Sequence, residues 1–342
     1  MPGIMYFYVH FVTEVLSFFF LYSIVGDGYL LWLAPFVYDI LAFVPQILIG
    51  VISDRFAKIP FGIIGILLLV FGLILFNLNV ALPTLFIVAV IALGNACVHV
   101  NGAEVTLRYG NGKIAPAAVF VAGGSFGVIT GKLLVGSIPV WPLIILAITA
   151  IMVIIFAEKY RRQTESMKAP CSKYNYSSTE ITAFIIAVAV AFVVAIRGYV
   201  GYGIPTSWNK TVFQSILLFS FMGIGKALGG ILVDNIGIRK TAYISMLGAL
   251  PFLIFGDSNM TISLIGVMFF SMTMAITLAI LVSAFSKTPG FAFGVTTVGL
   301  ALGALPIFFF RIDDVAINAI MITVASIICL FIILKITRKE KK

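Results

Sequence analysis

A six-residue pattern occurs twice in this chain of 342 residues, at an offset of 180 positions. The first copy is Gly50-Val-Ile-Ser-Asp54-Arg55 and the second is Gly230-Ile-Leu-Val-Asp234-Asn235. Each copy ends a long apolar run and is followed by basic residues. Self-similarity at this offset predicts two related halves, so a functional site is expected at the interface between them.

The apolar runs are long enough to cross a lipid bilayer. Hydrophobic residues make up 61% of the chain and charged residues 10%, with a mean hydropathy of +1.16, whereas soluble domains have about 25% charged residues. A membrane-spanning helix needs about 20 apolar residues. We predict an all-α polytopic membrane protein whose twelve transmembrane helices form two pseudo-symmetric six-helix bundles. The predicted spans are residues 4–25, 29–53, 60–78, 82–107, 114–136, 139–157, 180–204, 211–233, 240–256, 260–285, 290–310 and 314–336.

The distribution of Lys and Arg predicts the orientation of these spans, because cytoplasmic loops keep positive charge. Only Lys210 and Arg311 fall in loops on the external side, and Lys132, Arg197 and Lys226 fall within spans. The other basic residues lie on the side that holds both termini: Arg55, Lys58, Arg108, Lys113, Lys159, Arg161, Arg162, Lys168, Lys173, Arg239, Lys240, Lys287, Lys335, Arg338, Lys339, Lys341 and Lys342. We therefore expect a multi-pass protein of the inner cell membrane with both termini cytoplasmic. The net charge of +9 is explained by topology and needs no nucleic-acid partner.

One polar stretch divides the chain. Residues 158–179 are predicted to form a cytoplasmic linker between an N-terminal bundle, 1–157, and a C-terminal bundle, 180–336, with a basic tail at 337–342. The linker ends in Ser177-Ser-Thr-Glu180, which has the spacing of a helix capping box.

The three cysteines are Cys97 and Cys329, which lie in spans, and Cys171, which lies in the linker. Because no oxidising compartment holds two of them together, neither a disulfide nor a cysteine metal site is expected.

The repeated motif has a physical interpretation at the ends of two spans. Gly50 and Gly230 let a neighbouring helix approach closely. Asp54 and Asp234 oppose the dipole of their own helices, so each is better placed when it accepts hydrogen bonds from the N-terminus of another helix. We predict two conformational latches at the inner face, reinforced by Arg55 and Lys58 in the first copy and by Arg239 and Lys240 in the second. The alternative is an ordinary helix end followed by positive loop charge.

The pattern Gly-x-x-x-Asp-Arg-x-Ala-Lys, with its second copy Gly-x-x-x-Asp-x-x-Gly-x-Arg-Lys, resembles the loop signature of the major facilitator superfamily. That resemblance covers the whole chain. It implies two six-helix bundles that rock around a central substrate site, with the motif steadying the outward-facing state. Ala57 replaces a usual Gly and Asn235 a usual Arg, which predicts that the second latch is the weaker one.

Ionisable side chains inside the spans are candidate functional groups, because a charge in a bilayer is expensive. His10 and Glu14 share one face of the first span and are predicted to carry a proton, the alternative being a static, self-neutralising pair. Asp39 is either a second proton-coupling group or half of a structural lock with Lys132 or Lys226.

Several further polar residues within spans are candidates for binding substrate. Arg197 offers a planar fork suited to a carboxylate or phosphonate, the alternative being snorkelling to headgroups. Glu104 and Arg108 are spaced for a cytoplasmic ion pair. The remaining substrate-binding candidates are His99, Asn101, Lys226 and Lys132.

A narrower resemblance, to the fosmidomycin-resistance branch of the superfamily, rests on several short matches. They are His10-x-x-x-Glu14, Ala92-Leu-Gly94 before His99, Gly123-Gly124 with Gly127, Arg197 before a Gly/Tyr stretch, and Pro289 followed by Gly294, Gly299 and Gly303. This branch exports a phosphonate antibiotic and other small compounds. The glycine-rich stripe at Gly123 to Gly131 also resembles the exporter motif of the superfamily, although Lys132 stands where Pro is common.

These observations predict a proton-coupled secondary transporter, not an enzyme, that exports a small anionic or zwitterionic organic solute by alternating access. An importer or uniporter, a lipid or amphiphile transporter, and a receptor or scaffold without transport are the alternatives. We expect a monomer with no cofactor and no bound metal. Its partners are the substrate, the proton and the bilayer.

Overall fold

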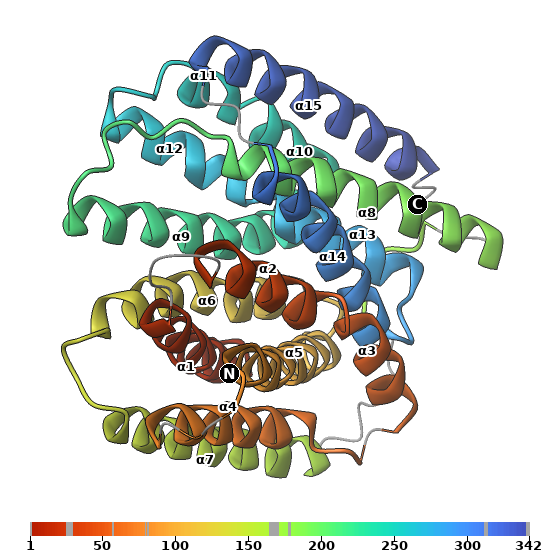
Figure 1. Cartoon of the computed structure of the whole chain (residues 1–342). Coiled ribbons are helices and arrows are strands. Elements are labelled where there is room, and N and C mark those ends of the chain that lie inside the picture. Colours follow the sequence, from red (N-terminus) through yellow and green to blue (C-terminus); the bar gives the residue numbers. More distant parts are fainter. Residues whose placement is uncertain are drawn as a thin grey trace.

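The computed structural model describes residues 2–24, 30–56, 58–78, 80, 82–163, 171–176, 179–310 and 314–339, and these are almost entirely helical (Figure 1). The predicted motif position Ala57 lies outside the described residues. The first half contains α1 (Pro2–Ile24), α2 (Leu30–Phe43), α3 (Gln46–Arg55), α4 (Phe61–Asn77), α5 (Thr84–Arg108), α6 (Ala115–Leu134) and α7 (Trp141–Gln163). The second contains α8 (Glu180–Tyr202), α9 (Val212–Ile236), α10 (Ile238–Met246), α11 (Ala249–Ile254), α12 (Met260–Ser271), α13 (Thr273–Ala284), α14 (Pro289–Ala304), the 3-10 turn η2 (Leu305–Phe308), α15 (Val315–Ile336) and the 3-10 turn η3 (Thr337–Lys339).

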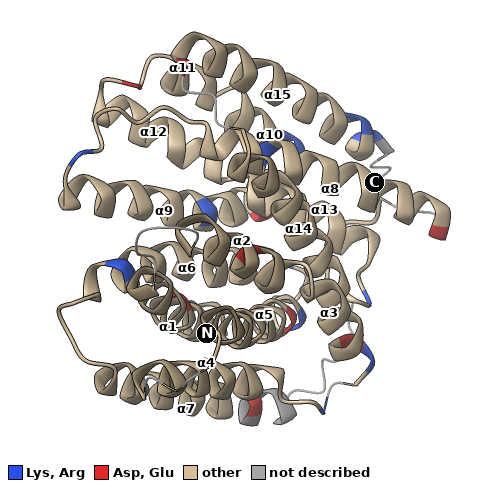
Figure 2. Ribbon diagram, in the orientation of Figure 1, with Lys and Arg blue, Asp and Glu red and all other residues tan. Residues whose placement is uncertain are grey.

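Most of these helices suit a bilayer. Within the described chain, 10 helical segments are long and apolar enough to cross a membrane, when α2 with α3, α12 with α13 and α14 with η2 are each counted as one. Two predicted spans fall short of this length: α4 has 17 residues, and the ninth span is divided into α10 and α11. Charged residues are sparse along the helices (Figure 2). The protein is a multi-pass membrane protein.

The two halves of the sequence occupy different parts of the molecule (Figure 1). Helices α1–α7 lie together in the lower part of the view and α8–α15 in the upper part. The most extensive packing across the boundary is that of α6 against α9 and of α3 against α14, and α14 also packs against α5 and α2.

Backbone interruptions divide two of the long helices. Pro45 separates α2 from α3, because proline has no N–H to continue the helical ladder. The carbonyl oxygen of Phe43, the last residue of α2, accepts a hydrogen bond from Thr297 Oγ1 on α14, at 3.1 Å. Met272 separates α12 from α13, and the side chain of Thr273 bonds back to the carbonyl oxygen of Phe270 at 2.9 Å.

A stripe of glycines on α6 lets α1 pack against it at backbone distance. A Cβ added at Gly123, Gly127 or Gly131 would overlap a carbonyl oxygen of α1. Glycines four residues apart lie on one helix face, so α1 and α6 touch along most of their length.

The region around the predicted linker differs from the sequence prediction in two details. Helix α7 continues to Gln163, past the predicted end at residue 157. Ser177 lies outside the described residues, and α8 is capped instead by Thr179, whose side chain accepts a hydrogen bond from Thr182 N. A full capping box is present at Thr211 and Gln214, where α9 begins. The three cysteines are free thiols.

Candidate functional site between the two halves

Three buried side chains meet near the middle of the helices. His10 and Glu14 are on α1 and His99 is on α5. The Nε2 atom of each imidazole lies 3.4 Å from Glu14 Oε1. The three residues are 4%, 6% and 6% exposed, respectively. The structure thus adds His99 to the pair predicted from the sequence, and we call His10, Glu14 and His99 the triad.

Backbone contacts fix the tautomers of both imidazoles. His10 Nδ1 lies 2.9 Å from the carbonyl oxygen of Phe120, and His99 Nδ1 lies 3.0 Å from that of Asn95. A carbonyl oxygen only accepts hydrogen bonds, so each Nδ1 carries the proton. In a neutral ring Nε2 then carries no proton and presents a lone pair. Two such lone pairs face the carboxylate of Glu14. The triad consequently needs at least one added cation to hold it together.

Asn95 and Ser17 support the carboxylate, although neither was predicted from the sequence. Asn95 Nδ2 donates to Glu14 Oε1 at 3.0 Å and to Ser17 Oγ at 3.1 Å. Gly124 leaves room for the His10 ring, since a Cβ there would lie 2.5 Å from two ring atoms. Asn95 lies one helical turn before His99 on α5, and this spacing could have indicated from the sequence that the two side chains share a face.

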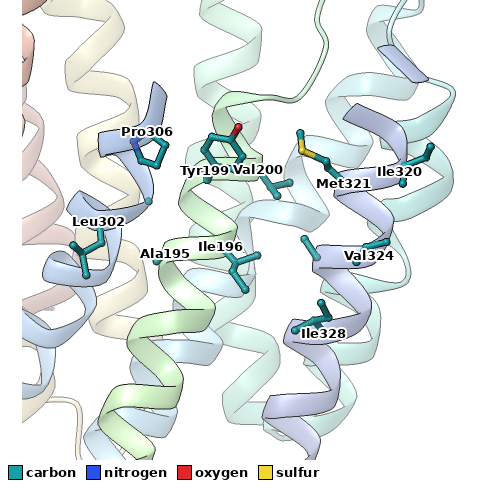
Figure 3. Close-up of a pocket in the computed structure, with 12 residues that line it drawn as sticks. Ala195, Ile196, Tyr199, Val200, Leu302, Pro306, Ile320, Met321, Val324 and Ile328 are labelled. Atoms are coloured by element: carbon teal, nitrogen blue, oxygen red, sulfur yellow. The ribbon is translucent and has the colours of Figure 1, made fainter. Parts of the chain in front are cut away.

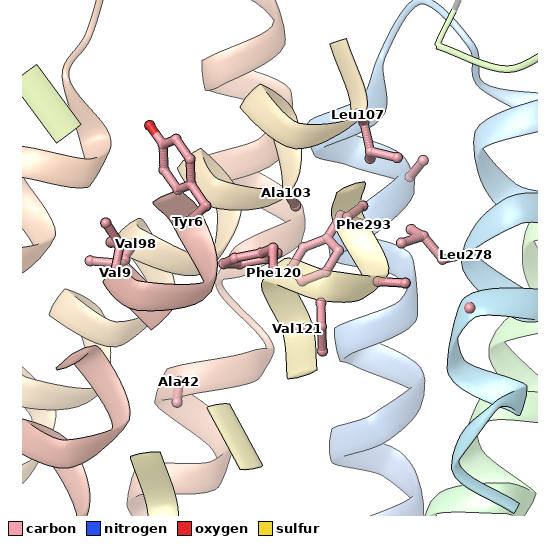
Figure 4. Close-up of a cluster of buried hydrophobic side chains, with 14 of the residues drawn as sticks. Tyr6, Val9, Ala42, Val98, Ala103, Leu107, Phe120, Val121, Leu278 and Phe293 are labelled. Carbon is pink, nitrogen blue, oxygen red and sulfur yellow. The ribbon is translucent and has the colours of Figure 1, made fainter. Parts of the chain in front are cut away.

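An aromatic contact closes the triad on one side. The ring centroid of Phe120 on α6 lies 4.8 Å from that of His10 and 6.3 Å from that of His99. It also lies 6.3 Å from the ring centroid of Phe293 on α14. Figure 4 shows Phe120 and Phe293 side by side among buried apolar side chains from both halves. This contact lies between the triad and the ends of the helices where α6 and α14 begin. We call that end, which also holds residues 171–176, the linker end.

The predicted intramembrane lysines have different surroundings. Lys226 on α9 donates a hydrogen bond to Ser125 Oγ on α6, at 2.8 Å, and so joins the two halves. Lys132 is exposed in the last turn of α6, with Nζ 5.0 Å from the ring centroid of Tyr22. Asp39 is 8% exposed, and in the described chain neither lysine forms an ion pair with it.

Arg197 is buried within the second half. Its Nη2 donates to Phe270 O at 2.8 Å and to Thr273 Oγ1 at 2.9 Å, and its Nη1 is 3.4 Å from Ser326 Oγ. The guanidinium also lies over the Phe270 ring, 3.2 Å from the centroid. Arg197 thus binds the C-terminal end of α12, where the helix dipole favours a cation, and its Nε has no partner among the described residues.

Asn101 is buried in the first half, on the side of α5 that faces α1 and α4. It accepts a hydrogen bond from Tyr6 Oη at 3.0 Å, and a Cβ added at Gly62 would overlap its side chain. These contacts place Asn101 outside the triad.

Asp54 binds the N-terminus of a helix from the other half. Its Oδ1 accepts from Gly290 N at 3.1 Å and its Oδ2 accepts from Phe291 N at 2.8 Å, both in the first turn of α14. Helix α14 has no side-chain cap of its own, so Asp54 supplies the missing acceptor. A Cβ at Gly50 would overlap the carbonyl of Gly290, which explains why the motif has glycine there.

A short charged network holds Asp54 in position. Arg108 Nη2 is 3.0 Å from Asp54 Oδ1, and Arg108 Nε is 2.9 Å from Glu104 Oε1, which gives the predicted ion pair. Ser53 donates to the other oxygen of Glu104. Arg55, predicted to reinforce this latch, is exposed and lies over the ring of Phe56. The basic residue that performs this role is Arg108.

Asp234 makes the reciprocal contact. It accepts hydrogen bonds from Ile114 N at 2.9 Å and Ala115 N at 2.8 Å, where α6 begins without a side-chain cap of its own. A Cβ at Gly230 would overlap Ala118 of α6. Arg239, predicted to reinforce this latch, is exposed.

The linker segment lies against both latches. Lys173 Nζ donates to Asp234 O at 2.8 Å, and Tyr174 Oη donates to Val233 O at 3.0 Å. Cys171 N donates to Ser286 O at 3.1 Å, in the loop before α14. The Cys171 side chain is buried, and burial raises the pKa of its thiol to about 11.

A separate apolar groove of about 530 Å³ lies between α8, α15 and the end of α14 (Figure 3). Its walls include Ile196, Tyr199, Leu302, Val324 and Ile328. Apart from the Tyr199 hydroxyl these side chains are hydrocarbon, so the groove provides no charged group for an ionic ligand.

No family model and no curated protein matches the sequence. Solved structures do match over the whole chain. One is the Major Facilitator Superfamily transporter FucP in the outward conformation, with a TM-score of 0.67 and 15% identity, covering 100% of this chain and 99% of that one. Another is a variant of the E. coli fucose:proton symporter FucP, with a TM-score of 0.69 and 15% identity, covering 100% of this chain and 98% of that one. The chain therefore has the fold of a Major Facilitator Superfamily transporter.

Proposed function

We propose that this protein is a proton-coupled secondary transporter that moves a small anionic or zwitterionic organic solute by alternating access. The main support for this proposal is the triad of His10, Glu14 and His99. Glu14 faces two imidazole lone pairs in a buried site, and this arrangement needs a mobile cation. Glu14 and His10 carry the proton in this proposal, and His99 completes their site. The similar E. coli protein is named as a fucose:proton symporter, which supports a proton as the coupling ion.

In this proposal the chain forms twelve membrane spans in two bundles, residues 1–157 and 180–336, with both termini in the cytoplasm and one copy acting alone. The linker end is the cytoplasmic face. Asp54 and Asp234 hold this face closed, so substrate reaches the triad from the opposite side.

Lys226 is the best-supported substrate contact, because it lies on α9 and reaches across to α6 of the other half. Its ammonium group attracts an anionic substrate, and opening the boundary frees it from Ser125. Arg197 contributes through its unpartnered Nε, and Asp39 provides a second acid on α2.

We propose outward transport because the glycine stripe of α6 resembles the exporter motif; the same stripe packs α1 against α6. Import, or uniport without a coupling ion, is the alternative. The apolar groove between α8 and α15 favours a second candidate, transport of an amphiphile that enters from the bilayer.

The test has two stages. A thermal-shift screen of small acids, zwitterions, sugars and amphiphiles on purified protein identifies a ligand. Proteoliposomes then measure its transport under pH gradients of both directions, with wild type beside Glu14→Gln. The proposal predicts gradient-driven transport that Glu14→Gln abolishes. Equal gradient-driven transport by Glu14→Gln would make the proton assignment wrong.

A further inference from the structure

The triad has the donor set and the spacing of a transition-metal site. Two imidazole nitrogens and a carboxylate oxygen all lie within 4.8 Å of one another, and all three residues are buried. The two Nε2–Oε1 separations are 3.4 Å. Bonds of about 2.0–2.1 Å to a tetrahedral metal place neighbouring ligand atoms roughly 3.3–3.4 Å apart. Each imidazole nitrogen therefore already lies at the ligand spacing of such an ion from Glu14 Oε1.

The surrounding hydrogen bonds prepare the imidazoles for metal ligation. Metal-bound histidines usually donate their second N–H to a carbonyl or carboxylate, which fixes the tautomer and aims the free nitrogen. His10 and His99 both do so, through Phe120 O and Asn95 O. Asn95 Nδ2 also orients the Glu14 carboxylate. The groups around the three ligands are thus already arranged as they are in metal sites.

The nearby charged groups leave the carboxylate available. Lys226 on the facing helix α9 donates to Ser125, and no ion pair in the described chain joins it to Glu14. Asp39 on α2 is a further buried carboxyl group in the same half of the molecule. Two imidazoles with one carboxylate suit Zn²⁺ and Co²⁺, whereas Ca²⁺ and Mg²⁺ prefer oxygen ligands only.

We propose that His10, Glu14 and His99 bind one divalent transition-metal ion, with the fourth position left for water. The inference concerns the site of the proposed function and extends it, because the metal fills the place that the proton takes in transport. Metal bound there would hold the triad in one charge state and inhibit proton-driven movement.

The test uses the full chain without a histidine tag, purified in detergent, with its three cysteines replaced by alanine. The chain has only two histidines, so any imidazole signal from bound metal comes from His10 and His99. Equilibrium dialysis with Zn²⁺ measures the stoichiometry, and Co²⁺ absorption measures the geometry. We expect one ion per chain and the intense visible bands of tetrahedral Co²⁺. X-ray absorption on the Zn²⁺ form should show imidazole scattering.

Three variants and a matched control locate the site. His10→Gln, Glu14→Gln and His99→Gln should each weaken Zn²⁺ binding more than about tenfold. Asp257→Asn, which removes a carboxylate in the loop before α12 of the second half, should bind as wild type. Octahedral Co²⁺ without imidazole scattering, or undiminished binding in all three variants, would overturn the proposal. Wild-type protein that binds no Zn²⁺ would also overturn it. The Co²⁺ spectrum and the Zn²⁺ stoichiometry are measured on wild type, so these two outcomes do not depend on whether the variants fold.

The metal proposal and the transport proposal fail separately. Proton-driven transport in the presence of a chelator, together with no metal binding, would leave the proposed function standing and remove the metal site. Metal binding without any transport would leave the metal site standing and remove the proposed function.

Discussion

Asp54 and Asp234 make reciprocal contacts across the boundary between the two halves. Asp54 of the first half accepts hydrogen bonds from the start of α14, and Asp234 of the second half accepts them from the start of α6. Each aspartate caps a helix that has no side-chain cap of its own. An N-terminal cap is worth about 1 kcal/mol, and hydrogen bonds to a charged acceptor about 1.5–3 kcal/mol. Two such contacts are strong enough to set which end of the molecule is closed.

The motif glycines should be essential for this closure. Alanine at Gly50 or Gly230 would overlap Gly290 or Ala118. We expect each substitution to destabilise the closed linker end by about 1–3 kcal/mol, the usual effect of overpacking. The thermal unfolding temperature of purified protein measures the loss. Gly198→Ala is the control, because a Cβ there meets only ordinary contacts of 3.4 Å or more. Equal stability of all three variants would contradict the close-approach argument.

Cys171 should report whether the linker end is closed. Burial raises the pKa of its thiol to about 11. Because the reactive thiolate forms only as pH rises toward that pKa, about 0.1% is present at pH 8. Maleimide labelling at pH 8 should therefore be slow in wild type. In Asp54→Ala the thiol becomes exposed and should react with the pKa of an ordinary cysteine, about 8.5. Both proteins carry Cys97→Ser and Cys329→Ser, so that only Cys171 reacts. Rapid labelling of wild type would show that the linker does not cover this end.

Arg197→Lys separates a structural role from a substrate role. A lysine cannot reproduce the contacts of the guanidinium with Phe270 and Thr273 at the end of α12. We expect the free energy of unfolding to fall by about 1.5–3 kcal/mol, which a melting curve detects. Lys132→Gln, which changes an exposed cation, should melt as wild type. Unchanged melting of Arg197→Lys with a more than tenfold loss of ligand affinity would instead assign Arg197 to the substrate.

Phe120 should keep water from the linker end away from the triad. Its ring contacts both histidines and Phe293. In Phe120→Ala we expect proteoliposomes to leak protons without substrate, because the truncation opens a path to Glu14. A pH-sensitive dye inside the vesicles measures the leak. Phe126→Ala is the control, because its ring contacts Phe7 and not the histidines. A leak equal to that of the control would contradict the gating role.

Much of the fold could be predicted from local patterns. The apolar runs have the length of the observed helices, and the duplicated motif correctly placed Asp54 and Asp234 at helix ends. The hydrogen bonds to neighbouring helices follow from the dipole argument. Identifying those neighbours was beyond the sequence, because the starts of α6 and α14 lie far from the motifs along the chain.

The site shows the same limit. His10 and Glu14 could be paired because they are one helical turn apart, whereas His99 reaches them only through the packing of α5 against α1. Arg55, next to Asp54 in sequence, was predicted to reinforce the latch, and the basic residue that contacts Asp54 is instead Arg108 of α5. Helix rotation determines which neighbour a side chain meets, and a single sequence specifies that rotation only approximately.

The most direct test of alternating access measures the width of the linker end. Spin labels at Lys58→Cys and Lys287→Cys, two exposed positions beside α3 and α14, report it by double electron–electron resonance in a cysteine-free background. We predict one short distance in wild type. In the double variant Asp54→Ala, Asp234→Ala a longer distance should appear, because the loss of both contacts shifts the population toward an open linker end. Identical distance distributions in the two proteins would contradict the account.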